Sequence, residues 1–253
     1  MRIKITFIGK EKVVLPVGFN EYIQALIYNH IDKDSAEWLH NKGFAFEKRK
    51  FKLFVFSYIL ERGFFDKNTR TFTFPKEINF YISSPVDWIL EQIASNLIKS
   101  ETIRLGQNEL RVLSIAVIKH DKIKENSVKI NAITPIETHS TFTKPDGKKI
   151  THYYTPFEKE FGELIDKNMK KKWTAFYKRE CPHSIAIKPL FKGNRNERII
   201  YFGTGNKKTL IKGWKGYFRL EGETEFLQFA LDAGLGGRNP QGFGMIEIIR
   251  SEI

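Results

Sequence analysis

The 253-residue sequence contains a single cysteine, Cys181, so it cannot form an internal disulfide bond. Its cysteine and histidine residues lack the spacing typical of zinc ligands, and we expect neither a metal nor another cofactor. No apolar run approaches the length that spans a bilayer, and the N-terminus alternates charged with apolar residues instead of forming a signal peptide. We therefore expect a cytoplasmic protein with no membrane partner.

Acidic residues are scarce relative to basic ones. The 42 Lys and Arg against 29 Asp and Glu give a net charge of +13 and a pI near 9.6. This charge favours a polyanionic partner, although charge alone also fits a thermophilic or ribosomal-type protein with solvated lysines, or a membrane-surface binder. The 41% hydrophobic content and 22 phenylalanines are typical of a folded protein, and the length fits two domains.

The first half is expected to run strand, helix, strand, strand, helix, strand. The segments that predict this order are residues 3–7, 20–31, 52–56, 78–82, 85–98 and 109–118. Asn20 is the expected cap of the first helix, and a further short helix over residues 35–44 should end at Gly43.

The second half repeats this order approximately. Its segments are residues 128–133, 155–176, 184–187, 213–220, 225–233 and 245–249, with a hairpin turn at 145–147 and a strand at 198–202. The predicted fold class is α+β, with two tandem ferredoxin-like (βαββαβ) domains whose antiparallel sheets carry helices on one face. We expect the domains to occupy residues 1–122 and 123–253.

A glycine-rich loop, residues 234–244, lies between the last predicted helix and the last strand. Its glycines leave room for a nucleotide backbone and free backbone amides, while Arg238, Asn239 and Gln241 add groups suited to phosphate and 2′-hydroxyl contacts. No Gly-Lys-Ser or Gly-Lys-Thr follows, which excludes a nucleoside triphosphate loop. A tight connection between a helix and an edge strand explains the composition equally well.

Two regions resemble a known family. The glycine-rich loop, with Arg238, Asn239 and then Gln241 to Met245 before the final strand, resembles the C-terminal signature of the CRISPR-associated repeat-processing endoribonucleases of the RAMP superfamily. Residues 26–31, 38–40 and 51–57 resemble the same family's segment from first helix to second strand. The resemblance implies metal-independent cleavage of CRISPR repeat RNA, in which the 2′-hydroxyl attacks the adjacent phosphate. The products are a cyclic phosphate and a 5′-hydroxyl, and the released pieces serve as guide RNAs.

The resemblance also implies three catalytic residues, which fall on Tyr28, His40 and Lys52. An imidazole can take and return a proton, an ammonium can stabilise the phosphorane, and a phenol can orient or donate. Each residue also has a structural explanation: Tyr28 in helix packing, His40 in the dipole of a helix end, and Lys52 in a solvated basic run. His30 is the alternative catalytic histidine.

RNA binding is predicted for a basic region of the second half and for the loop. The residues concerned are Lys188, Lys192, Arg195, Arg198, Lys207, Lys208, Gly236, Gly237, Arg238 and Gln241. Aromatic residues among the lysines could stack on unpaired bases, whereas an edge hairpin kept soluble by lysines is the alternative. The lysines of residues 167–172, on the long predicted helix, are expected to form a solvated face.

The partners that this reading implies are CRISPR repeat RNA, subunits of a CRISPR effector complex and a second copy of the chain. The competing function is a non-catalytic RAMP-type subunit that binds guide RNA. The joint presence of His40 and Lys52 favours the enzyme, because a binding subunit needs neither.

Overall fold

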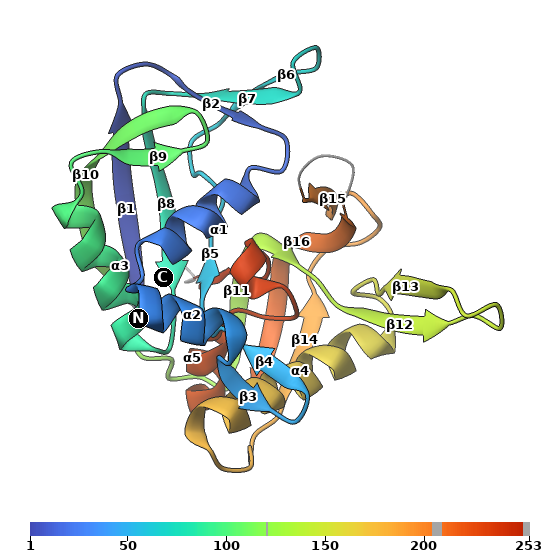
Figure 1. Cartoon of the computed structure of the whole chain (residues 1–253). Coiled ribbons are helices and arrows are strands. Elements are labelled where there is room, and N and C mark those ends of the chain that lie inside the picture. Colours follow the sequence, from blue (N-terminus) through green and yellow to red (C-terminus); the bar gives the residue numbers. More distant parts are fainter. Residues whose placement is uncertain (120, 204–208, 250–253) are drawn as a thin grey trace.

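The computed structural model describes residues 1–119, 121–203 and 209–249, and the predicted RNA-binding residues Lys207 and Lys208 lie outside these ranges. Two antiparallel sheets with associated helices dominate the structure (Figure 1).

The first sheet has the strand order β5-β8-β1-β10-β9. Its strands are β5 (Val55–Phe56), β8 (Glu77–Ser83), β1 (Arg2–Gly9), β10 (Asn108–Ile118) and β9 (Ile103–Leu105). Alternate residues Ile3, Ile5 and Phe7 of β1 are buried, as the two-residue period of a strand requires. They share a core with the apolar stripes of helices α1 (Asn20–Asn29) and α3 (Asp87–Lys99).

The second sheet has the order β14-β16-β11-β17, and β15 pairs with a further part of β16. Its strands are β14 (Ile185–Pro189), β16 (Thr209–Gly222), β11 (Ser127–Ile136), β17 (Ile246–Ile248) and β15 (Glu197–Phe202), accompanied by helices α4 (Lys159–Tyr177) and α5 (Thr224–Ala233). In the first sheet, β1 lies between β8 and β10, and β5 lies on the outer side of β8. In the second sheet, β11 lies between β16 and β17 in the same way, and β14 lies on the outer side of β16. This common order confirms the predicted α+β class with two ferredoxin-like units.

Three smaller pieces extend the two units. Helix α2 (Lys33–Asn41) is followed by a hairpin of β3 (Phe44–Phe46) and β4 (Arg49–Phe51). Strands β2 (Val13–Pro16), β7 (Thr71–Phe74) and β6 (Phe64–Asp66) form a small sheet. The hairpin of β12 (His139–Thr143) and β13 (Lys149–Tyr153) projects from the body of the molecule (Figure 1).

The two units are joined by polar contacts and by one continuous hydrophobic core. The buried Arg2 guanidinium donates to the Ile246 carbonyl oxygen at 2.6 Å and to that of Leu231 at 3.4 Å. The ammonium of Met1 lies 3.1 Å from a carboxylate oxygen of Asp232. The boundary between residues 122 and 123 stays a prediction.

Two local expectations were wrong, and both errors lie near the cleft described below. Only Val55–Phe56 of the predicted strand 52–56 pairs with the sheet, because Leu53 has a left-handed φ of 52° that interrupts extended structure. Asn20 is the first residue of α1 and does not cap it, since its side-chain amide donates to the Gln241 carbonyl oxygen at 3.0 Å. In the described ranges, no helix is both long and apolar enough to span a membrane.

Candidate active site and the glycine-rich loop

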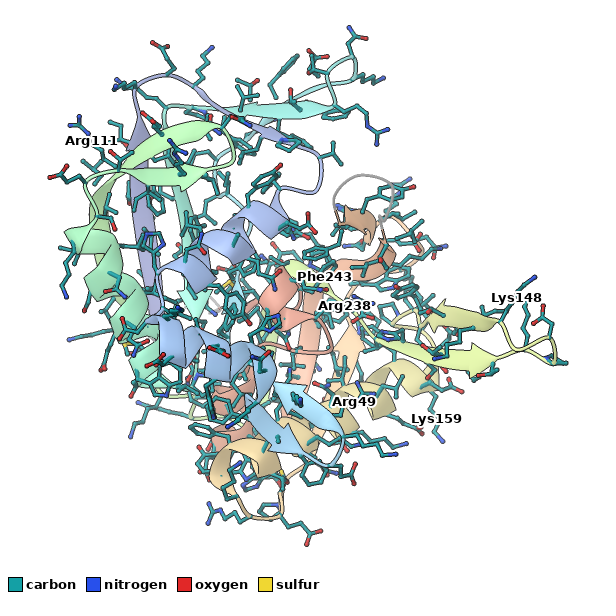
Figure 2. All side chains as sticks on the ribbon, in the orientation of Figure 1. Arg49, Arg111, Lys148, Lys159, Arg238 and Phe243 are labelled. Atoms are coloured by element: carbon teal, nitrogen blue, oxygen red, sulfur yellow. The ribbon has the colours of Figure 1, made fainter. Side chains whose placement is uncertain are left out.

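A cleft of about 460 Å³ brings the three predicted catalytic side chains together with the glycine-rich loop. Its lining residues are Glu21, Gln24, Ala25, Tyr28, His40, Lys50, Lys52, Arg238, Pro240 and Gln241. They come from α1, α2, the end of the β3–β4 hairpin and the loop, so the cleft contains parts of both sheet units. Figure 2 shows Arg238 near the centre of the molecule, away from Lys148 at the tip of the β12–β13 hairpin.

Tyr28 forms the inner wall of the cleft. Its ring packs edge-on against Phe54, with centroids 5.7 Å apart, and against the His40 ring at 6.2 Å. Burial raises the pKa of Tyr28 to about 12, so the phenol keeps its proton at neutral pH. Tyr28 can therefore donate a hydrogen bond to a ligand but is poorly suited to act as a base.

His40 is exposed in the last turn of α2 and carries the ring that faces Tyr28. Its Nδ1 lies 3.0 Å from the side-chain oxygen of Asn41. An amide oxygen only accepts hydrogen bonds, so Nδ1 carries a proton in this arrangement, and Nε2 of a neutral ring is free to accept one. The alternative, His30, places its Nδ1 2.7 Å from the Leu26 carbonyl oxygen and does not line the cleft.

Lys52 is fixed at the C-terminal end of α2. Its ammonium donates to the carbonyl oxygens of Leu39 and His40, where the helix dipole favours a cation. Burial, with a smaller contribution from Lys50, lowers the pKa of Lys52. Gly43 makes this approach possible: it has a φ of 57°, and a Cβ there would lie 2.6 Å from the Phe51 carbonyl oxygen.

The glycines of the loop pack against the protein itself. A Cβ on Gly242 would lie 2.7 Å from the Phe56 ring, and one on Gly236 would collide with the Glu137 carbonyl oxygen. The amides of Gly237 and Gly244 donate to the carbonyl oxygens of Glu137 and Pro135 at 2.9 and 2.8 Å. The expectation that glycines leave room and free amides for RNA is therefore wrong at these positions, where internal packing uses both.

Two predicted loop residues do face the cleft. Arg238 adopts a left-handed φ of 56° and donates from Nη1 to the side-chain oxygen of Gln241 at 3.1 Å. Both side chains line the cleft that contains His40. Gly236 and Gly237 line an adjoining cavity of about 170 Å³, which also includes Lys52.

The predicted basic region lies apart from the cleft lining. Lys188 on β14 pairs with Glu221 at 3.7 Å, and Arg198 on β15 donates to the carbonyl oxygen of Arg195 at 2.9 Å. Lys192 and Arg195 are exposed in the connection between these strands. Strand β15 nevertheless lies against the turn before α1. The two are so close that a Cβ on Gly18 would come within 2.9 Å of the Tyr201 carbonyl oxygen.

Sequence reasoning missed three polar residues of the cleft, Glu21, Gln24 and Lys50. Spacing held a usable signal for the first two, since residues 21, 24 and 28 share one face of α1. The burial of Lys172 was not predicted either: this residue was expected on a solvated face but is only 2% exposed.

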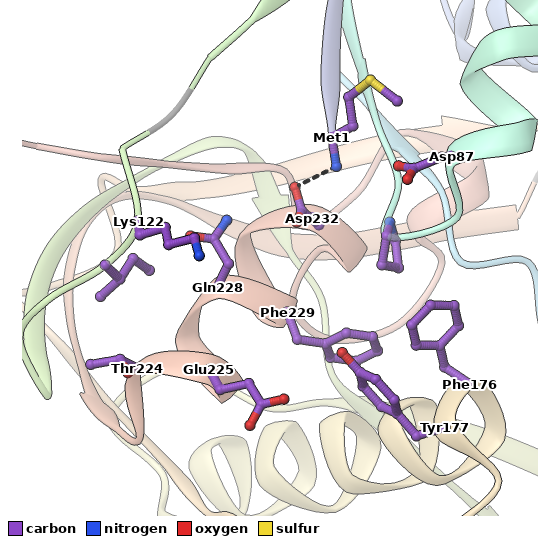
Figure 3. Close-up of a pocket in the computed structure, with 12 residues that line it drawn as sticks. Met1, Asp87, Lys122, Phe176, Tyr177, Thr224, Glu225, Gln228, Phe229 and Asp232 are labelled. Atoms are coloured by element: carbon purple, nitrogen blue, oxygen red, sulfur yellow. Dashed lines mark hydrogen bonds and ion pairs between the residues drawn. The ribbon is translucent and has the colours of Figure 1, made fainter.

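A second cavity, of about 450 Å³, lies where α5 and the end of α4 meet the N-terminus (Figure 3). Carboxylates of Asp87, Glu225 and Asp232 line it, together with the aromatic side chains of Tyr177 and Phe229. Lys122 and the Met1 ammonium, which pairs with Asp232, also belong to the lining and partly offset the three carboxylates. Among the described residues, no group of three or more His, Cys, Asp or Glu side chains is arranged to hold a metal ion.

Comparisons with known proteins identify the family. The profile of "CRISPR associated protein Cas6, C-terminal" matches residues 118–248, and that of "CRISPR-associated protein Cas6, N-terminal" matches residues 14–116. The chain belongs to the Cas6 family. This confirms the resemblance seen in the glycine-rich loop and in the N-terminal segments.

Individual Cas6 relatives match over nearly the whole chain. The CRISPR-associated endoribonuclease Cas6 1 of Methanocaldococcus jannaschii is 27% identical over 249 residues, covering 97% of this chain and 92% of the relative. The CRISPR-associated endoribonuclease Cas6 of Pyrococcus furiosus is 26% identical over 259 residues, with coverage of 98% and 90%. A solved structure titled "CRISPR associated protein Cas6" has a TM-score of 0.77 at 25% identity, and the match covers 99% of each chain.

The cleft combines residues from both Cas6 profiles. Tyr28, His40 and Lys52 fall within the N-terminal match, whereas Arg238 and Gln241 fall within the C-terminal match. The cleft is therefore complete only when both parts of the Cas6 chain have folded and packed together.

Proposed function

We propose that this chain is a metal-independent endoribonuclease that cuts CRISPR repeat RNA into guide RNAs, with Tyr28, His40 and Lys52 at the site of cleavage. The main observation in support is that these three side chains line one cleft together with Arg238 and Gln241. The curated relatives named CRISPR-associated endoribonuclease support the reaction type.

The reaction needs only proton transfer and charge stabilisation. The 2′-oxygen of one ribose attacks the adjacent phosphorus, and its proton passes to a base. The bond from phosphorus to the 5′-oxygen breaks, and an acid returns a proton to that oxygen. The products are a 2′,3′-cyclic phosphate and a 5′-hydroxyl, and no electrons are transferred to or from a cofactor.

The geometry suggests a role for each side chain. His40 is the base, because Nδ1 is held by Asn41 and Nε2 can accept the 2′-hydroxyl proton. Tyr28 keeps its proton at neutral pH and donates a hydrogen bond to the phosphate or to the leaving oxygen. Lys52 has three ammonium protons, of which two contact the α2 carbonyl oxygens, and the third can stabilise the phosphorane.

The RNA backbone is held by the loop and then by the basic region. Arg238 and Gln241 contact phosphate and ribose beside the cut, and the RNA continues over β15 toward Lys188, Lys192, Arg195 and Arg198. The contact between β15 and the turn before α1, the helix that lines the cleft, supports this path. The proposal also includes that the protein stays with the cleaved RNA in a CRISPR effector complex and that it associates with a second copy of itself.

The decisive experiment is a cleavage assay with repeat RNA in chelator. Wild-type protein should cut RNA but not a substrate with one deoxyribose on the 5′ side of the cut. His40→Ala should bind RNA and cut it at least about a hundredfold more slowly, as loss of a general base predicts. His30→Ala is the matched control and should cut normally.

Each alternative gives a distinct result. Cleavage of the deoxy substrate, or dependence on added divalent metal, would refute the mechanism. A slow His30→Ala with a normal His40→Ala would reassign the base. Wild-type protein that binds repeat RNA and cuts nothing would be the non-catalytic guide-RNA subunit.

A further inference from the structure

Lys172 differs from its neighbours on α4. Lys170 pairs with Asp166 at 2.7 Å and Lys171 with Glu47 at 3.5 Å, and both side chains are more than a third exposed. The side chain of Lys172, in contrast, is buried between α4 and the glycine-rich loop.

All the oxygen atoms that Lys172 contacts are neutral and belong to the loop. Its ammonium donates to the carbonyl oxygen of Gly234 at 2.8 Å, to that of Gly236 at 3.1 Å and to the side-chain oxygen of Asn239 at 2.7 Å. Burying an ammonium without a carboxylate partner opposes folding through loss of hydration, and a methionine of similar size would avoid this cost. A purely packing role therefore does not account for a lysine at this position.

Asn239 extends the contacts of Lys172 across the loop. Its side-chain nitrogen donates to the carbonyl oxygens of Leu235 and Phe243, each at 3.0 Å. Lys172 and Asn239 together thus hold both sides of the loop. Arg238 directly precedes Asn239 and has a left-handed backbone conformation, so its direction depends on where Asn239 is fixed.

We propose that Lys172 is a positioning residue that holds the glycine-rich loop so that Arg238 and Gln241 face the cleft, without touching RNA itself. This assignment rests on the proposed function for the identity of the ligand. The hydrogen bonds that it invokes are internal to the protein and can be tested without RNA.

The first test needs no RNA. Hydrogen exchange of the Leu235, Gly237 and Gly244 amides, which donate to carbonyl oxygens within the protein, should accelerate at least about tenfold in Lys172→Met. The exposed Lys167→Met removes the same charge from the same helix and should leave these amides unchanged. Unchanged loop exchange in folded Lys172→Met would overturn the assignment. If Lys172→Met does not fold, Lys172→Gln replaces it: its shorter side chain has two N–H donors for three oxygen atoms, so loop exchange should still accelerate, and unchanged exchange would overturn the assignment.

The second test asks whether Lys172 acts through Arg238. Lys172→Met should weaken repeat-RNA binding about tenfold in the wild-type background, but less than about threefold when Arg238 is already alanine. Equal losses in both backgrounds would show an independent charge effect and overturn the proposal. Absence of RNA binding by the wild-type protein would refute the proposed function, and loop exchange would then decide the role of Lys172 alone.

Discussion

The buried Lys172 should make the stability of the protein rise with pH above neutrality. Burial lowers its pKa from 10.5 to about 7 in the folded state, whereas the unfolded chain restores the ordinary value. Below pH 7 both states are protonated, and the full desolvation cost opposes folding. Between pH 7 and 10.5 only the unfolded state binds this proton, so the free energy of unfolding increases with pH and levels off above that range.

The size of the effect follows from the shift in pKa. The interval from 10.5 to about 7 corresponds to roughly 5 kcal/mol, with a slope of about 1.4 kcal/mol per pH unit. From about pH 7, where the folded-state group is already half deprotonated, to pH 9 the wild-type protein should gain about 2 kcal/mol relative to Lys172→Met, which has no such proton. The other ionisable groups of the same cavity, Arg49, Lys50, Lys52 and Arg238, are all cations and cannot offset the buried charge.

The assay is urea unfolding between about pH 6 and pH 9, with the fluorescence of the neighbouring buried Trp173 as one probe. The measured quantity is the difference in unfolding free energy between wild-type and Lys172→Met, in which shared titrations cancel. The exposed Lys167→Met should give a difference that does not change with pH. A similarly flat difference for Lys172→Met would refute the reasoning.

Three further predictions concern the cleft and the loop. Arg238→Ala should weaken RNA binding about tenfold and reduce its salt slope by about one unit, whereas the matched Lys148→Ala at a hairpin tip should do neither, as salt titrations would show. Gly236→Ala should destabilise the fold by more than about 2 kcal/mol in thermal unfolding, because a Cβ would collide with Glu137; Gly193→Ala has nearly the same φ and open space, so an equal cost there would contradict the packing argument. Tyr28→Phe keeps the ring packing and loses only the hydroxyl, so cleavage should slow at least about tenfold with an unchanged melting temperature; an unchanged rate would remove Tyr28 from the chemistry.

The order of elements could be predicted because hydrophobic periodicity directly reports which face is buried. The apolar stripe of α3 and the alternate apolar residues Ile3, Ile5 and Phe7 of β1 are local sequence patterns. In the folded chain, these residues of β1 and most of the α3 stripe are buried. The strand expected at residues 52–56 is shortened to Val55–Phe56, because the left-handed backbone of Leu53 cannot be read from hydrophobic periodicity. The β3–β4 hairpin and Gly43 bring Lys52 back to the end of α2, and the run of charged and aromatic residues does not reveal this return.

Family resemblance and residue chemistry indicate the candidate catalytic residues, but their assembly in one cleft depends on tertiary packing between distant parts of the chain. Lys172 shows most clearly what local sequence patterns cannot predict. It follows Ile165 by seven residues and Met169 by three, so the helical period places it on the buried stripe of α4. Its charge nevertheless predicts an exposed side chain. The carbonyl oxygens that it binds lie more than sixty positions later in the chain, so no local pattern reveals them.

The location of the loop also has a consequence for biosynthesis. A ribosome releases the segment with Tyr28, His40 and Lys52 early, but the wall of the cleft with Arg238 and Gln241 emerges only after almost two hundred further residues. Until those residues emerge, the first unit lacks the groups proposed to grip RNA. A truncated or still-growing chain should therefore leave cellular transcripts intact, and cleavage should begin only once the last strands are in place.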